Sequence, residues 1–384
     1  MITATSFTRE WMMDHCRQRP GLDPSILEKM ILALTLVERL VETGLPFTFK
    51  GGTCLVLVLG QARRFSVDVD LVTQAELTAI NAALTQVCAQ PPFRSFEYDA
   101  TRSHKDDVPR GHYYVFYDSA LDQQLLAEHP QRSIAIDLLF EQHNYPQVLQ
   151  LPVASVFLHQ AGEPLRVAAP SVESIAGDKL TAFAPRTTGI LYGKGKELEI
   201  IKQLFDLGVL FDQVQHVAIV AESFASTVAK ELRYRHLTET AAADVLVDAL
   251  QTALLLAQMK LNRAPAKELA PAELRRGIAG FRNFIIDGAF REDQAVAAAA
   301  RVAYLAARLL TQDYSPLPRP VPGTDPRTFF VPNPDFNYLN KLRSVPGDAL
   351  FYWHHTVALL QGHEQLAWLG NQSASSFPVI RGYT

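Results

Sequence analysis

"FKGGTCLVLVLGQARRFSVDVDL" spans residues 49–71 and contains the two features on which the fold assignment depends. Gly51 and Gly52 follow a short extended segment, residues 47–50, and precede an apolar run, residues 53–59, with the composition of a buried helix. Backbone N–H groups at a helix N-terminus bind phosphate oxygens readily where no Cβ is in the way. The alternative is an ordinary strand-to-helix turn, so the glycines predict a phosphate site only in combination with a second feature.

The second feature is an alternation of apolar and polar residues over 65–72, the pattern of a half-buried strand. Because residues i and i+2 of a strand point to the same side, Ser66, Asp68 and Asp70 share one face. Two close carboxylates repel each other unless a cation lies between them, and oxygen ligands suit Mg²⁺ (or Mn²⁺) bound together with substrate phosphates. For the aspartates alone, a solvated strand face is the alternative. Together with the glycines they predict a nucleotide site, with Ser66 contacting phosphate.

Three further side chains are assigned to this predicted site. Asp137 lies in an apolar segment, residues 133–140, where a carboxylate needs a partner. We expect it to be a third metal ligand; the alternative is a core aspartate paired with an arginine. Thr53 and Arg64 are expected to contact phosphate, although Arg64 could instead pair with a carboxylate.

The element order before residue 168 predicts a small mixed sheet with helices on one side. The predicted segments are helices at 24–44, 53–59 and 74–88 and strands at 47–50, 65–72, 93–98, 112–117 and 133–140. After residue 170, helical periodicity predicts helices at 172–184, 197–211, 213–235, 238–258, 271–286, 291–312 and 347–361. We therefore expect a mixed α/β domain over residues 1–168 and a mostly α-helical domain over residues 169–384.

The formal net charge of the 384-residue chain is −4. General nucleic-acid binders are usually basic, so any RNA contact is expected from local clusters. The candidates are residues 230–236 and 273–284, where basic and aromatic residues alternate. A solvated helix face is the alternative for each cluster.

Targeting and redox signals favour a cytoplasmic location. Cys16, Cys54 and Cys88 form no CxxC pair, which argues against a disulfide framework or a zinc site and fits a reducing compartment. The N-terminal segment lacks the basic-then-apolar order of a secretory signal. The apolar segment 295–310 is interrupted by arginines, so we expect a buried helix there and no membrane partner.

Four segments together resemble the motifs of the AbiEii-like abortive-infection nucleotidyltransferases, which belong to the DNA polymerase β-like superfamily. They are "FKGGTCL" (49–55), "RFSVDVDL" (64–71), "ESIAGDKLTAF" (173–183) and "IKQLFDL" (201–207). The resemblance implies that Lys179 clamps the triphosphate and that Asp206 joins Asp68 and Asp70 as a catalytic residue. Where the family often has Arg-Asp, this chain has Lys-Gln at 202–203, so one carboxylate of the fourth motif is missing.

The resemblance also implies a function. Residues 1–168 would form a nucleotidyltransferase domain, and the first helices of the second domain would complete its nucleotide site. The enzyme would transfer a nucleoside monophosphate from an NTP to an acceptor, with tRNA 3′ ends as the expected acceptor. It would act as the toxin of a toxin–antitoxin pair, with a cognate antitoxin as partner. Two alternatives stay open: AMP or UMP transfer to a protein, and a non-catalytic nucleotide-binding regulator.

Overall fold

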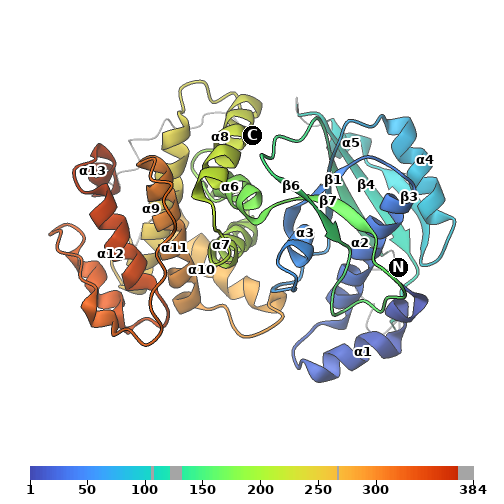
Figure 1. Ribbon diagram of the computed structural model, residues 1–384, viewed down its shortest axis with the longest axis horizontal. Coiled ribbons are helices and arrows are strands. Elements are labelled where there is room, and N and C mark those ends of the chain that lie inside the picture. Colours follow the sequence, from blue (N-terminus) through green and yellow to red (C-terminus); the bar gives the residue numbers. More distant parts are fainter. Residues whose placement is uncertain (105–107, 122–131, 266–267, 371–384) are drawn as a thin grey trace. The chain divides into compact units, whose positions relative to one another are not determined.

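The structure, a computed structural model, describes residues 1–104, 108–121, 132–265 and 268–370. The chain folds into two compact units (Figure 1). The first consists of Met1–Ser171 with Asn283–Gly288, and the second of Val172–Arg282 with Ala289–Thr384. The sequence predicted a boundary at residue 168 and gave no indication that a later segment returns to the first unit.

The first unit is of mixed α/β class, as predicted. Its helical elements are η1 (Ala4–Phe7), α1 (Arg9–Gln18), α2 (Pro24–Glu42), α3 (Gly51–Val58), α4 (Leu77–Cys88) and α5 (Ala100–Ser103). Its strands are β1 (Thr48–Lys50), β2 (Val69–Thr73), β3 (Phe93–Tyr98), β4 (Arg110–Tyr117), β5 (Ser133–Phe140), β6 (Val148–Pro152) and β7 (Arg166–Pro170).

Five strands form a mixed sheet of order β1-β2-β5-β4-β3, and β6 pairs with β7 in a separate two-stranded sheet. β2 and β5 run parallel, whereas the other neighbours in the large sheet are antiparallel. The parallel pair places Asp70 directly opposite Asp137. Two strands that are distant in the sequence therefore bring two of the predicted site residues beside each other.

One face of the large sheet is covered by helices and forms the core of the first unit. Ile134, Ile136 and Leu138 of β5 are almost fully buried on this face. Tyr113 of β4 lies on the same face, and its hydroxyl donates to Oδ1 of Asn81 in α4 at 2.9 Å. Figure 1 shows α4 alongside β3 and β4. The opposite face is therefore the one on which Asp70 and Asp137 lie, because side chains alternate along a strand.

A buried ion pair ties α2 to the sheet. Glu28 is 1% exposed and accepts hydrogen bonds from Ser119 Oγ, the Ala120 N–H and Nη1 of Arg132, the last at 3.1 Å. Arg132 is itself buried and directly precedes β5. Removing one partner of such a pair costs about 3–5 kcal/mol, because the other charge is left buried without compensation.

The second unit is helical. Its main helices are α6 (Val172–Ala182), α7 (Glu197–Phe211), α8 (Val217–Tyr234), α9 (Ala242–Lys260), α10 (Leu269–Phe281), α11 (Glu292–Leu310), α12 (Ala349–Leu360) and α13 (Glu364–Gly370). Short 3₁₀ turns are η3 (Arg282–Phe284), η4 (Pro326–Thr328) and η5 (Asn337–Ser344). Helix α9 packs against α11, and α6 packs against α8. By length and composition α9 could cross a membrane, but 78% of its apolar window is buried within the protein.

Several predicted boundaries were wrong. The strand expected over 65–72 is only β2, Val69–Thr73, because residues 65–68 pair with no strand of the sheet. The helix expected from residue 53 begins at Gly51, so the glycines form its first turn. Helix α1, strands β6 and β7 and helix α13 were not predicted, because each is short and has a weak periodic signal.

The connection between α6 and α7 is fastened to α9 by Asp248. This carboxylate is fully buried and accepts hydrogen bonds from the Arg186 N–H at 2.7 Å and the Thr187 hydroxyl at 2.9 Å. Burial raises the pKa of Asp248 to about 6, although the charge of Arg186 and these hydrogen bonds oppose the shift.

We predict that Asp248 makes the helical unit less stable as the pH rises. The folded state holds this proton more tightly than the unfolded state, so the contribution is fully present below about pH 3.8 and is lost as the pH rises through about 6. The loss amounts to about 3 kcal/mol for a shift of this size. Asp248→Asn cannot ionise, so its unfolding free energy relative to wild type should increase between pH 4 and pH 7 in urea titrations. A difference that does not change with pH would contradict the assignment.

Candidate active site

The first turn of α3 is in close contact with the motif that follows it. Gly51 has φ +77, and a Cβ on Gly51 would overlap the Asp70 carboxylate, whose Cγ would be only 2.6 Å away. A Cβ on Gly52 would lie 2.6 Å from Oγ of Ser66 and 2.7 Å from Nη2 of Arg64. Both glycines are therefore required by close approach, and the structure gathers five of the predicted site residues at one helix N-terminus.

Thr53 fixes the backbone of the Asp68–Asp70 segment. Its side chain is fully buried, and its hydroxyl donates to the carbonyl oxygen of Asp68 at 2.6 Å. Asp68 itself is exposed and lies immediately before β2. The hydroxyl of Thr53 thus has a positioning role in this structure, and its predicted phosphate contact stays a prediction.

Strand pairing places four polar residues in one row across the sheet. Lys50 of β1 is opposite Asp70 of β2, Asp70 is opposite Asp137 of β5, and Asp137 is opposite His112 of β4. Neighbouring strands lie about 4.8 Å apart, so each side chain is within reach of the next. We call Lys50, Asp70, Asp137 and His112 the charged row. Two carboxylates at its centre are flanked by a cation and an imidazole.

Asp137 is held by two side chains that the sequence analysis did not identify. Nδ1 of His112 lies 2.5 Å from Oδ1 of Asp137, and Nη2 of Arg102 lies 3.5 Å from Oδ2. Burial lowers the pKa of Arg102, but the hydrogen bond to Tyr114 and the charges of Asp137 and Asp68 outweigh burial and raise it. The positive charge of Arg102 therefore interacts with the carboxylates of both Asp137 and Asp68. The alternative stated for Asp137, a partner arginine, is thus present, together with a histidine.

No sequence signal identified His112 and Arg102. The alternation of residues 112–117 indicates on which side of a strand His112 lies, but not which strand is its neighbour. Arg102 lies in α5, in a charged segment without periodicity. Only the pairing of β4 with β5 brings His112 opposite Asp137.

The carboxylates have the donor chemistry of a magnesium site. Mg²⁺ is usually bound through one or two carboxylates and substrate phosphates, and Asp68 and Asp70 supply such a pair. Among the residues that the structure describes, no three His, Cys, Asp or Glu side chains are grouped closely enough to hold a metal ion. The assignment of Asp68 and Asp70 as ligands stays a prediction, and so does that of Asp137, whose oxygens contact His112 and Arg102.

Lys179 and Asp206 form a buried ion pair within the helical unit. Nζ of Lys179 in α6 lies 2.8 Å from Oδ2 of Asp206 in α7 and 2.9 Å from Oε1 of Gln203. The two side chains are 9% and 1% exposed. The third and fourth sequence motifs therefore meet in the fold, and the side chain of Gln203 contributes a neutral acceptor. Their roles as triphosphate clamp and catalytic carboxylate stay predictions.

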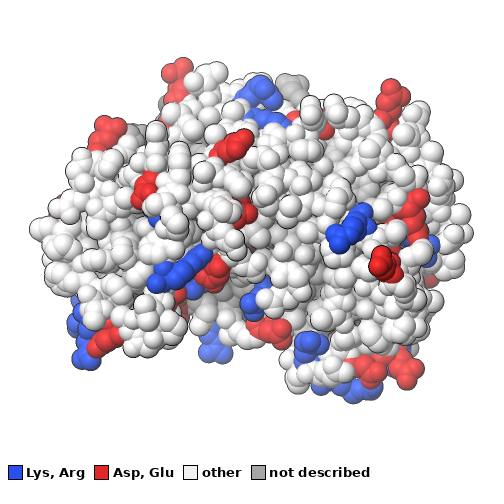
Figure 2. Space-filling view, viewed as in Figure 1, with Lys and Arg blue, Asp and Glu red and all other residues white. Residues whose placement is uncertain are grey.

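The two basic clusters are partly neutralised by neighbouring acids. Arg235 pairs with Glu231, and Arg276 contacts Glu197 at 2.8 Å. On the face drawn in Figure 2, basic and acidic residues form small, interspersed groups separated by uncharged surface. This face offers no broad basic surface for a nucleic-acid backbone, so the predicted contacts of residues 230–236 and 273–284 stay predictions.

Comparison with known families gives one match. A family model described as "Nucleotidyl transferase AbiEii toxin, Type IV TA system" matches residues 35–300, which include the glycine turn, the charged row and the Lys179–Asp206 pair. Among curated proteins, none matches the chain.

Two solved structures show weak likeness to the chain. One is a protein from H. pylori described as a nucleotidyltransferase, with 17% identity, a TM-score of 0.38, and coverage of 74% of this chain and 94% of that one. The other is the nucleotidyltransferase toxin MenT4 from Mycobacterium tuberculosis, with 14% identity, a TM-score of 0.41, and coverage of 80% and 99%.

We predict that Gly51→Ala disrupts the site more than its backbone strain explains. Gly60, at the other end of α3, has φ +65 with open space around its Cβ position, so Gly60→Ala reports strain alone. Gly51→Ala adds a clash with Asp70. We expect Gly60→Ala to cost about 1 kcal/mol and Gly51→Ala at least about twice that in chemical unfolding. Equal costs would mean that Asp70 does not pack against Gly51.

We predict that single removal of Lys179 or Asp206 destabilises the helical unit. Lys179→Met leaves a buried carboxylate and Asp206→Leu leaves a buried ammonium, each costing about 3–5 kcal/mol. The double variant removes both charges and should recover most of that loss. A double-mutant cycle measured by urea unfolding tests this, and additive single losses would show that the pair is not coupled.

Proposed function

Since this chain belongs to the AbiEii family of nucleotidyltransferase toxins, we propose that it transfers a nucleoside monophosphate from an NTP to the 3′ end of a tRNA. In this reaction the acceptor hydroxyl gives up its proton to solvent, and its oxygen forms a bond to the α-phosphorus. The bond between the α-phosphorus and the bridging oxygen breaks, and pyrophosphate leaves. The modified tRNA would account for toxicity in the cytoplasm, and a cognate antitoxin would be the partner that restrains it.

The observation that carries this proposal is the contact of the glycine turn with Ser66, Arg64 and Asp70. Gly51 and Gly52 open the N-terminus of α3, which favours anions. The Ser66 hydroxyl and the Arg64 guanidinium lie against Gly52, where they can contact the same phosphate. Phosphoryl transfer needs mainly positioning and neutralisation of charge, and this cluster of donors can provide both.

Asp68 and Asp70 would hold the divalent cation. A bound Mg²⁺ ion would neutralise charge on the triphosphate and would lower the pKa of the acceptor hydroxyl. The chain itself keeps the two carboxylates in place, because Thr53 anchors the Asp68 backbone and Gly51 packs against the Asp70 side chain. Asp137 would complete or orient the site, since it lies beside Asp70 and is fixed by His112 and Arg102.

In the helical unit, Lys179 would act as triphosphate clamp and Asp206 as catalytic carboxylate, supported by the family to which the chain belongs. Both lie in the matched region, residues 35–300. Their ion pair holds the two side chains next to each other. Substitution of either residue would therefore disturb the proposed role of both residues and the stability of the helical unit.

The proposal is tested by the fate of the α-phosphate of the NTP. Each of the four NTPs, labelled at the α-phosphate, is incubated with the protein, Mg²⁺ and total RNA or total protein. Label in RNA of tRNA size supports the proposal. Label in protein favours the protein-modifying alternative, and tight NTP binding without label transfer favours the regulatory one.

We predict that Asp68→Asn and Asp70→Asn each reduce transfer by about 100-fold or more, the range observed when a single group that stabilises charge is removed from an active site. Each change keeps the shape of the side chain but removes its charge. Asp118→Asn is the matched control, because Asp118 is an exposed aspartate of the same unit whose carboxylate lies 3.2 Å from Nη1 of Arg94. Chelation of the metal should abolish transfer and added Mg²⁺ should restore it. Near-wild-type transfer by either site variant would refute the metal assignment.

A further inference from the structure

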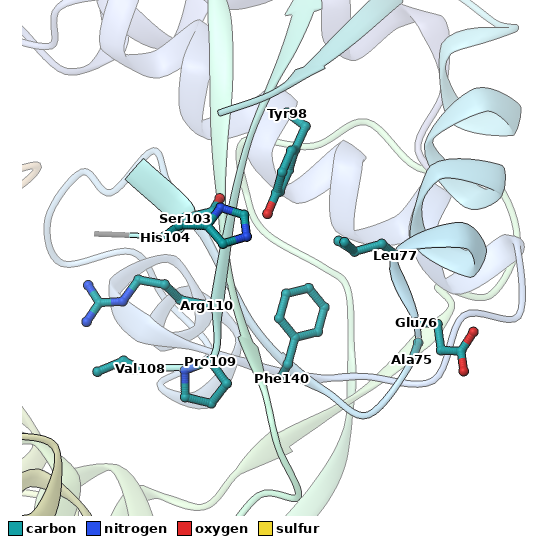
Figure 3. Close-up of a pocket in the computed structure, with 10 residues that line it drawn as sticks. All are labelled: Ala75, Glu76, Leu77, Tyr98, Ser103, His104, Val108, Pro109, Arg110 and Phe140. Atoms are coloured by element: carbon teal, nitrogen blue, oxygen red, sulfur yellow. The ribbon is translucent and has the colours of Figure 1, made fainter. Parts of the chain in front are cut away.

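A cavity lies at one end of the large sheet in the first unit. Its volume is about 440 Å³, within the size range of small-molecule sites. Figure 3 shows the residues that surround it. The side chains that matter for its chemistry are Leu77 at the start of α4, Tyr98 at the end of β3, His104 after α5, and Phe140 at the end of β5.

This cavity is on the other side of the sheet from the charged row. Tyr98 pairs with Tyr113, which faces α4, and the rings of Tyr98 and Tyr113 are 5.0 Å apart. Phe140 continues the series of Leu138 on the same face, whereas Asp137 and the other members of the charged row point to the opposite face. A ligand in this cavity is therefore distinct from the triphosphate at the glycine turn.

Aromatic rings from three separate elements surround the cavity. Tyr98 and His104 meet edge to face with centroids 6.4 Å apart, and Phe140 lies across from them. Gly111 makes the position of Phe140 possible, because a Cβ there would lie 2.8 Å from Cε2 of Phe140. The absence of a side chain at Gly111 lets the Phe140 ring extend over β4. Flat apolar walls of this kind suit a planar ligand.

Two polar groups at the cavity, the hydroxyl of Tyr98 and the ring of His104, can form hydrogen bonds to the edge of a ligand. The hydroxyl of Tyr98 points into the cavity in Figure 3. Nδ1 of His104 lies 2.8 Å from the carbonyl oxygen of Ala100, and a ring that donates there presents Nε2 as an acceptor. The carboxylate of Glu76 and the guanidinium of Arg110 point away from the cavity. Among the lining residues that the structure describes, the cavity thus provides stacking surfaces and hydrogen-bonding groups, and the charged ends of Glu76 and Arg110 are turned outward.

We propose that this cavity binds an unpaired nucleobase of the acceptor RNA, an inference that rests on the proposed function. Proteins recognise unpaired bases by stacking them on Phe, Tyr or His rings and by hydrogen bonds to their edges, and both means are present here. A base is planar and uncharged, which fits flat aromatic walls with hydrogen-bonding groups beside them.

The test is binding of a short single-stranded RNA to the full-length protein, followed by fluorescence anisotropy at fixed salt. Tyr98→Ala removes one stacking ring and should weaken binding about 10-fold or more, as for loss of one base–aromatic stack. Leu77→Trp fills the cavity and should have a similar effect. In a series of RNAs, each nucleotide in turn is replaced by an abasic unit. The replacement at the position whose base enters the cavity should weaken binding to wild type but should not weaken binding to Tyr98→Ala further. NTP affinity should not change in either variant.

The matched control is Leu269→Trp. Leu269 is the first residue of α10, follows a glutamate and is 54% exposed, just as Leu77 is the first residue of α4, follows a glutamate and is 41% exposed. This control should bind RNA like wild type. Unchanged RNA affinity in both Tyr98→Ala and Leu77→Trp would refute the proposal, and so would a loss of NTP affinity in place of RNA affinity. Because the assay measures binding without turnover, its outcome is independent of whether label transfer to RNA occurs.

Discussion

The contact between the Asp70 carboxylate and the backbone of Gly51 is the constraint on which the candidate site depends. It requires a residue without a Cβ at the start of α3, and it requires β2 to run beside that helix terminus. The positive end of the helix dipole favours a carboxylate there. A triphosphate at the same place would meet that negative charge, so the two can coexist only with a cation between them. Ser66 and Arg64, which lie against Gly52, provide donors without adding further negative charge.

The parallel pairing of β2 with β5 extends this contact into a site. It brings Asp137 beside Asp70, and the pairing of β5 with β4 adds His112. The same alternation that places these polar residues on one face buries Ile134, Ile136 and Leu138 on the other, against the helices. The candidate site and the apolar core of the first unit therefore lie on opposite faces of one sheet. The buried Glu28–Arg132 pair helps to hold that arrangement, because it fixes α2 to the residue that precedes β5.

Much of the fold followed from local patterns. Strands β3 and β5 and helix α7 lie within the ranges predicted from periodicity, because each has a sustained alternation or helical stripe and clear flanking breaks. The mixed α/β class followed from the order of these elements. The predicted strand at 65–72 was too long, since alternation describes which side chains share a face and not whether a neighbouring strand pairs with them. Strands β6 and β7 depend on each other for pairing and carry little signal alone.

The sequence by itself determined the glycine turn, the two aspartates of the second motif and the family to which they point, because these residues lie close together in the chain and their geometry is local. Only the tertiary structure decided the partners of the more distant residues. His112 and Arg102 meet Asp137, Asp206 meets Lys179, and Tyr98 and Phe140 share a cavity. Each of these contacts joins elements that are far apart in the sequence. The register of strand pairing and the packing of helices decide which residues meet, and no periodicity within a single segment contains that information.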